Sequence, residues 1–238
     1  MIDEENNIKE NGLITEKQRF IHSILFPGFF IAILWIIKIF EMEFNLDLYH
    51  LGVYPRKISG IIGIITSPFI HGSFEHLYNN STSLFVLTLA VFYFYRPIQY
   101  KVFFLIYIMS GIWVWFGGRN AYHIGASGIV YGLASFIFFS GVIRNDIRLM
   151  AISLIVVFLY GSMVWGIFPI KHTISWESHM LGSVAGLILA IYYRKYGPKP
   201  LKFSWETEDE NIENEITDTS DSESQINASQ DQSGNCDQ

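Results

Sequence analysis

Three polar clusters interrupt an otherwise apolar sequence, and they hold side chains that could do chemistry. They read HGSFEHLYNN (residues 71–80), HIGASGIVYG (residues 123–132) and ESHMLGSVAG (residues 177–186). Half of the 238 residues are hydrophobic and only 16% are charged, which is well below the roughly 25% of soluble domains. This composition indicates a membrane protein, and strongly polar side chains inside membrane helices by default mark a function.

The second cluster predicts a nucleophilic serine. Ser127 would begin a helix over residues 127–143, which is about 25 Å long against a hydrocarbon core of about 30 Å. Such a helix begins below the membrane surface, where its free N–H groups and its dipole favour developing negative charge. Gly125 and Gly128 would let the backbone approach a substrate closely.

The third cluster supplies a candidate base. His179, Gly182 and Gly186 are spaced i, i+3, i+7 and share one helix face. The two glycines form a GxxxG surface that allows close helix contact, and the helix of Ser127 carries a matching pair of glycines at 128 and 132. We therefore expect His179 to reach Ser127 and to act as its general base.

The first cluster supplies hydrogen-bond donors. His76 and Asn80 are spaced i, i+4 on one face, and both could donate to an oxyanion together with the backbone N–H of Ser127. Tyr131, one turn after Ser127, is expected to stack on the ring of His179. The three clusters would begin at the same depth from the same side of the membrane, so they can form one site.

Each cluster also has a simpler interpretation. Small residues in a membrane helix are typical of a packing face, and His76 with Asn80 could be interhelical hydrogen-bond partners. Glu177 cannot complete a triad with His179, because residues i and i+2 do not face each other on a helix. It is the coincidence of three clusters at one depth that favours a serine–histidine dyad.

A metal site is a further alternative. The residues His71, Glu75 and His76 form HxxxEH, which is one residue longer than the motif of inverted zinc proteases, and no HExxH is present. We therefore predict neither a metal nor a cofactor.

Six apolar runs could position these clusters as membrane helices. They cover residues 21–40, 77–95, 102–117, 127–143, 149–168 and about 177–193. With the N-terminus inside, eleven lysines and arginines lie in inner segments and four in outer loops, with Lys38 within the first run. The bias predicts that both termini are cytoplasmic.

The sequence divides into three parts. Residues 1–20 are expected to be a cytoplasmic N-terminal segment, residues 21–195 a six-helix membrane domain, and residues 196–238 an acidic, disordered cytoplasmic tail. Between the first two runs, residues 41–74 mix apolar residues with Gly, Pro, Arg and Lys, which indicates a partly membrane-embedded outer loop.

These motifs resemble those of the rhomboid intramembrane serine proteases. The matching elements are GASG at residues 125–128 followed by Tyr131, HxxxN from His76 to Asn80 preceded by His71, and HxxG from His179 to Gly182. The resemblance covers about residues 21–195. It implies an all-α, six-transmembrane-helix bundle in which a serine–histidine dyad, without a cofactor, cleaves peptide bonds in or beside transmembrane segments.

Residue by residue, the resemblance implies that Ser127 is the nucleophile and His179 the base. His76, Asn80 and the Ser127 amide would form the oxyanion hole, shaped by Gly125, and Tyr131 would pack on the base. His71 and the glycines at 128, 182 and 186 would support them. Partners would be transmembrane protein substrates and the lipid bilayer, not nucleic acid, and the compact chain suits a bacterial inner membrane.

The sequence departs from the family at one place. Many members carry a Trp-Arg pair in the first outer loop, where this chain has YPRK at residues 54–57; Arg56 is the candidate replacement. Two other functions stay open, namely a non-catalytic protein that binds transmembrane helices and a small-solute transporter. The intact Ser127–His179 pair disfavours the first, and the absence of visible inverted repeats disfavours the second.

Overall fold

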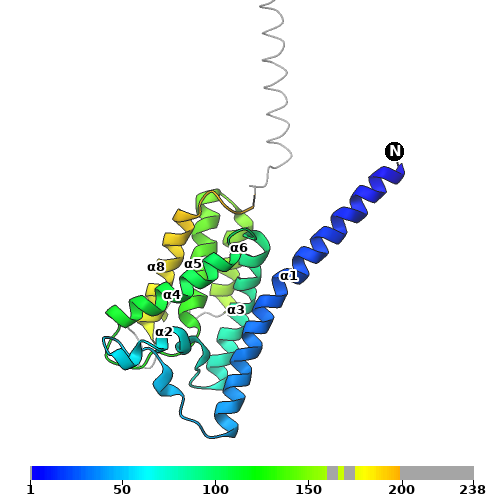
Figure 1. The fold of residues 1–238 in the computed structure, drawn as a ribbon. Helices are drawn as coiled ribbons and strands as arrows, with labels where there is room; N and C mark the ends of the chain where they lie inside the picture. Colours follow the sequence, from blue (N-terminus) through cyan, green and yellow to red (C-terminus); the bar gives the residue numbers. More distant parts are fainter. Residues whose placement is uncertain (1, 160–165, 169–174, 199–238) are drawn as a thin grey trace, which may run out of the picture. The chain divides into compact units, whose positions relative to one another are not determined.

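The computed structural model describes residues 2–159, 166–168 and 175–198, and this part of the chain is helical (Figure 1). Four short helical elements, which are α2 and three 3-10 turns, lie between the long helices α1 and α3. One bridge between Val53 and His123 joins two loops. The helices are α1 (Ile2–Glu43), α2 (Gly63–Thr66), α3 (Phe74–Phe94), α4 (Gln99–Gly117), α5 (Ser127–Arg144), α6 (Ile147–Leu159) and α8 (Trp176–Tyr192), and the 3-10 turns are η1 (Tyr49–Leu51), η2 (Ile58–Gly60) and η3 (Ser67–Phe69).

Each predicted apolar run coincides with a helix, with two differences. Helix α1 begins at Ile2, well before the predicted start at residue 21, because the helical backbone continues into the polar N-terminal segment. The fifth run falls on α6, which is described only as far as Leu159, and residues 160–165 and 169–174 lie outside the described residues. The predicted tail lies almost wholly beyond them too.

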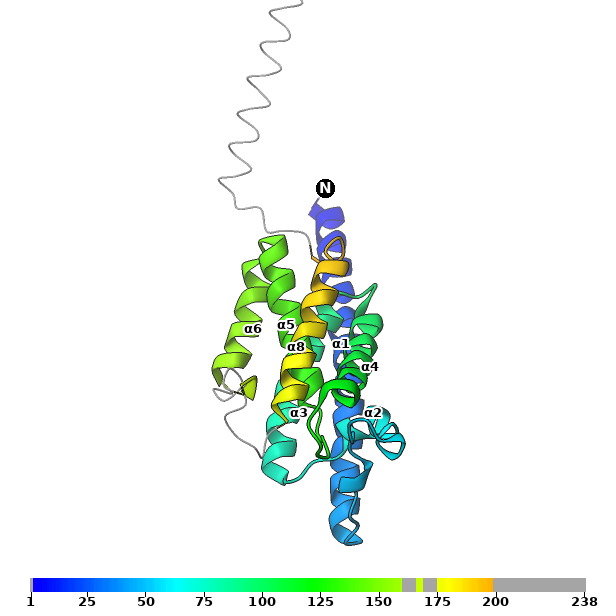
Figure 2. The ribbon, with the colours of Figure 1, turned by 90° about the vertical axis from the view of Figure 1, so that its left-hand side faces the viewer.

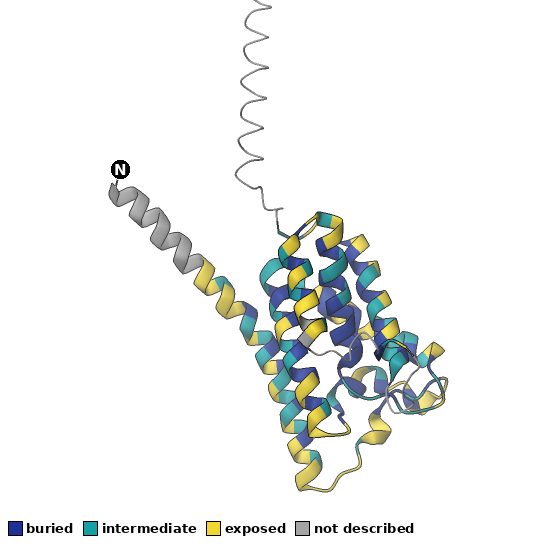
Figure 3. Ribbon diagram, turned by 180° about the vertical axis from the view of Figure 1, so that it is seen from behind, coloured by how far each residue is buried: buried dark blue, intermediate teal, exposed yellow. Residues whose placement is uncertain are grey.

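Three of the described helices are long and apolar enough to cross a membrane. They are the Glu16–Glu43 part of α1, together with α4 and α5. Helix α3 has 21 residues but begins with polar ones, and α8 has only 17. Large apolar side chains such as Phe29, Phe116 and Phe158 are exposed, which suits contact with lipid rather than water. Figure 3 shows that exposed positions recur along the helices.

Helix α5 lies at the centre of the bundle. Of its membrane-span window 72% is buried, against 39% for α4 and 22% for α1. Its neighbours are α3, α4, α6 and α8, and Figures 1 and 2 show them around it. The helix is apolar on nearly all sides, as a buried helix must be. Its first residue, Ser127, is therefore held inside protein.

Glycines bring α5 and α8 into close contact. A Cβ added to Gly182 would lie 2.1 Å from the carbonyl oxygen of Gly128, and one added to Gly186 would lie 2.0 Å from that of Gly132. Both distances are far inside van der Waals contact, so neither position of α8 has room for a side chain. The GxxxG surfaces of the two helices thus face each other, and this contact sets the distance between Ser127 and His179.

Candidate active site

Ser127 and His179 lie side by side at the N-terminal ends of α5 and α8. The Nε2 atom of His179 is 2.8 Å from the Oγ atom of Ser127, although the residues are 52 positions apart in the chain. Both side chains are buried, each with 7% of its surface exposed. A hydroxyl in hydrogen-bond contact with an imidazole is the arrangement that activates a serine nucleophile.

Two further residues hold the imidazole of His179. The ring of Tyr131 is stacked on it, with centroids 4.1 Å apart and planes 9° apart. The Nδ1 atom of His179 is 2.9 Å from the carbonyl oxygen of Gly166. The stacked tyrosine was predicted from the sequence, but the contact with Gly166 was not, because a backbone carbonyl has no signature in the sequence.

The predicted oxyanion donors face the loop in front of Ser127. Gly125 has a φ of +99°, and a Cβ built there would lie 2.9 Å from Nε2 of His76 and 3.5 Å from Nδ2 of Asn80. Within the described residues, Nδ2 of Asn80 is buried without a hydrogen-bond partner. An unpaired buried donor costs about 1–3 kcal/mol, so this amide would gain from a hydrogen bond to an acceptor at the site.

His71 supports this loop from the other side. Its Nε2 accepts a hydrogen bond of 3.5 Å from the backbone N–H of Ala126. Burial lowers the pKa of His71, which keeps the ring neutral and able to accept. The carbonyl oxygen of His71 accepts a bond of 2.8 Å from Lys38 of α1, whose ammonium group also lies 2.9 Å from Glu41.

Lys38 is a supporting residue that the sequence analysis left unassigned within the first run. The sequence feature that could have pointed to Lys38 is a lysine in an apolar helix with an acidic residue, Glu41, three positions later. Its second partner, the carbonyl of His71, lies 33 residues further along the chain. Only the tertiary structure shows that contact.

Comparison with known proteins now places the chain in a family. A Rhomboid domain matches residues 59–196, which is more than half of the sequence. This protein belongs to the rhomboid family. It is 28% identical to an uncharacterized protein of Mycobacterium tuberculosis over 170 residues, 68% of this chain and 71% of the relative.

A second relative has a name. A Bacillus subtilis protein that carries the provisional name rhomboid protease YdcA is 27% identical over 176 residues, which are 67% of this chain and 82% of that protein. An uncharacterized protein of Mycobacterium leprae is 25% identical over 171 residues, 68% of this chain and 67% of its own length. Rhomboids are membrane proteins, as the apolar helices of this chain require.

In this rhomboid the carboxylate of Glu177 bonds Arg119. Oε1 of Glu177 accepts a hydrogen bond of 3.3 Å from the backbone N–H of Arg119 and lies 3.6 Å from the Nε atom of the same residue. Glu177 therefore pairs with the loop before α5, while Nδ1 of His179 contacts the carbonyl of Gly166.

The structure adds no support for a metal site, because no three His, Cys, Asp or Glu residues of the described chain gather closely enough to hold a metal ion.

In this rhomboid the segment between α1 and α3 is held through Arg56 and a tryptophan from α4. Arg56 donates to the side-chain carbonyl of Asn120 at 2.7 Å, and its backbone N–H donates to the carbonyl of Trp115 at 3.0 Å. The indole N–H of Trp115 donates in turn to the carbonyl of Lys57 at 3.0 Å. Arg56 and Trp115 thus come from different elements and meet through backbone carbonyl groups.

The anchored loop also holds the segment before Ser127. Val53 and His123 exchange backbone hydrogen bonds of 2.9 and 2.8 Å, and the N–H of Gly125 donates to the carbonyl of Ser67 at 2.9 Å. His123 is buried, with Nδ1 2.5 Å from Oγ of Ser175.

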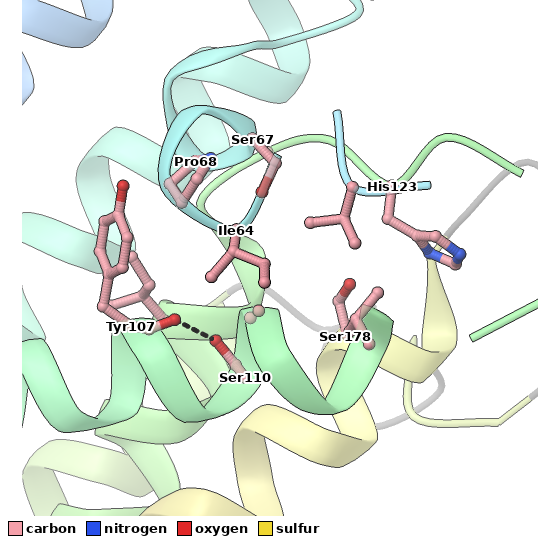
Figure 4. A pocket seen from close by; sticks show the side chains of 13 residues that line it. Ile64, Ser67, Pro68, Tyr107, Ser110, His123 and Ser178 are labelled. Atoms are coloured by element: carbon pink, nitrogen blue, oxygen red, sulfur yellow. Dashed lines mark hydrogen bonds between the residues drawn. The ribbon is translucent and has the colours of Figure 1, made fainter. Parts of the chain in front are cut away.

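A small cavity is lined in part by Gly125 and Gly128, and Figure 4 shows other residues around it. It has a volume of about 20 Å³ and lies between the segment before α3, α4 and the start of α8. Ser67, Ser110 and Ser178 line it, and Figure 4 shows the Ser110 hydroxyl bonded to the Tyr107 carbonyl. This volume is enough for about one water molecule.

Proposed function

We propose that this rhomboid is an intramembrane serine endopeptidase that cleaves peptide bonds in or next to transmembrane segments of membrane proteins. The observation that carries the proposal is the 2.8 Å contact between His179 Nε2 and Ser127 Oγ. It is supported by the provisional name of the Bacillus subtilis relative and by the family, whose members are generally serine proteases.

The first half of the reaction forms an acyl-enzyme. His179 Nε2 takes the hydroxyl proton of Ser127 while Oγ attacks the carbonyl carbon of the substrate. Negative charge develops on the carbonyl oxygen, where Asn80, His76 and the Ser127 N–H can donate hydrogen bonds. The tetrahedral intermediate then collapses, the C–N bond breaks, and the proton on His179 passes to the leaving amine.

The second half releases the acyl product. A water molecule gives a proton to His179 as it attacks the ester carbon, and the same donors stabilise the second oxyanion. When this intermediate collapses, the proton returns from His179 to Oγ of Ser127. The products are a carboxylic acid and the free enzyme.

The site would lie on the outer side of a bacterial inner membrane. In this proposal the chain has six spans, with both termini in the cytoplasm, because eleven of its lysines and arginines then lie inside. The first outer loop would lie partly in the membrane, and substrates would enter from the lipid beside α6, where Phe158 is 85% exposed.

The test compares three proteins purified in detergent. Wild type should cleave a fluorescent transmembrane peptide, and a fluorophosphonate should label its Ser127. The variants Ser127→Ala and His179→Ala should do neither while keeping the unfolding temperature of wild type. If all three are equally inactive and wild type resists the label, the chain is instead a non-catalytic protein that binds transmembrane helices.

A further inference from the structure

A histidine that acts as a base must carry no proton on the ring nitrogen that faces the nucleophile, which here is Nε2. A neutral imidazole carries one proton, so Nε2 of His179 can accept the hydrogen of Ser127 only when the proton lies on Nδ1. In many serine hydrolases a carboxylate holds that tautomer and the orientation of the ring. The carboxylate of Glu177 bonds Arg119 instead.

We propose that the backbone carbonyl of Gly166 takes over this role and is the positioning group for His179. This inference rests on the proposed function of the dyad. The carbonyl oxygen lies 2.9 Å from Nδ1 of His179. It can only accept, so it fixes the proton on Nδ1 and leaves the Nε2 lone pair directed at Ser127, 2.8 Å away.

Position 166 has no room for a side chain. A Cβ there would lie 2.2 Å from Oη of Tyr131 and 2.9 Å from Nδ1 of His179. Glycine thus lets the backbone pass directly against the edge of the stacked pair. The imidazole is then held on one face by Tyr131, at Nδ1 by Gly166, and at Nε2 by Ser127.

The neighbouring residue keeps the carbonyl in place. Ile167 packs against the hydrophobic core and lines an apolar cavity of about 320 Å³ between α5, α6 and α8, next to Tyr131. Ile167 is partly buried, and its packing against the core restrains the backbone of residue 166. Residues 166 and 167 therefore have a direct part in keeping the base ready for proton transfer.

The test is the variant Gly166→Ala, with Gly117→Ala as the matched control, because a Cβ at position 117 meets nothing within 4 Å. The added methyl group should push the segment off the stacked pair and lengthen the Nδ1 contact. We expect kcat to fall by about 10- to 100-fold with little change in KM, since a misplaced or wrongly protonated base acts on the chemical step.

Tautomer state is read separately, by ¹⁵N NMR of ring-labelled histidines, with His179 assigned by its loss in His179→Ala. Wild type and Ser127→Ala should both show the proton on Nδ1, and Gly166→Ala should show a mixture. The double variant Gly166→Ala with Tyr131→Phe removes the closest clash, so it should regain part of the activity and of the Nδ1–H signal. A purely structural defect would leave the tautomer unchanged.

The outcomes separate this inference from the function. If wild type cleaves but carries its proton on Nε2, or if Gly166→Ala changes neither kcat nor tautomer, the role of Gly166 is refuted and the dyad stands. If wild type shows Nδ1–H, which Gly166→Ala disturbs, yet cleaves nothing, the positioning contact stands and the protease proposal fails.

Discussion

The close contact between α5 and α8 gives a prediction whose size follows from the structure. In Gly182→Ala the new Cβ would lie 2.1 Å from the carbonyl oxygen of Gly128. Ordinary contact begins at 3.4 Å, so the two helices must separate by about 1 Å to accept it. Gly128 follows Ser127, and Gly182 lies one turn below His179, so the separation acts directly on the dyad.

The expected effect concerns both activity and stability. The Oγ–Nε2 distance of 2.8 Å would grow to nearly 4 Å, beyond hydrogen-bond range. A displacement of about 1 Å at the reacting groups can cost about 100-fold in rate, and forcing a methyl group into a packed contact costs about 1–3 kcal/mol of stability. The variant should therefore lose most of its kcat and unfold at a lower temperature.

The assay uses peptide cleavage and thermal unfolding in the same detergent. Gly28→Ala is the matched control, because a Cβ at that position of α1 meets nothing within 4 Å. It should keep the wild-type rate and lose no stability, since alanine is the better helix former. If Gly182→Ala cleaves and unfolds as Gly28→Ala does, the close α5–α8 contact does not set the geometry of the dyad.

Three further predictions concern single side chains. Asn80→Leu should lower kcat by about 100- to 1000-fold without loss of stability, because it removes a buried unpaired donor; a large drop in unfolding temperature would contradict this. Tyr131→Phe should keep the stack on His179 and most of the activity, whereas Tyr131→Ala should lose it; equal rates would argue against the stack. The side-chain hydrogen bonds from Arg148 hold the pKa of Asp146 below its ordinary value. This carboxylate therefore stabilises the fold above about pH 4, and its contribution is lost as the pH falls through the lowered native pKa. Asp146→Asn should thus lower the unfolding temperature at pH 7 and not in strong acid; a difference that persists unchanged at low pH would refute the charge argument.

Helix positions followed from the sequence because a membrane helix must be apolar over a fixed length. The start of α5 at Ser127 was predicted to the residue, since polar residues and glycines mark the boundary there. The polar N-terminal segment, by contrast, gave no sign that α1 begins at Ile2. Helical periodicity placed Tyr131 on the face of Ser127, and His179 on that of Gly182 and Gly186, because spacing along one helix fixes the face.

Contacts between elements needed the tertiary structure. Arg56 and Trp115, Lys38 and His71, and Gly166 and His179 are far apart in the chain, and each pair is joined through a backbone carbonyl. Every residue has a carbonyl, so residue type cannot show which one a distant side chain will meet. The sequence thus determined which side chains could do the chemistry and on which helices they lie. Packing alone decided which backbone atoms hold them in place, because that depends on how closely glycine lets the helices approach.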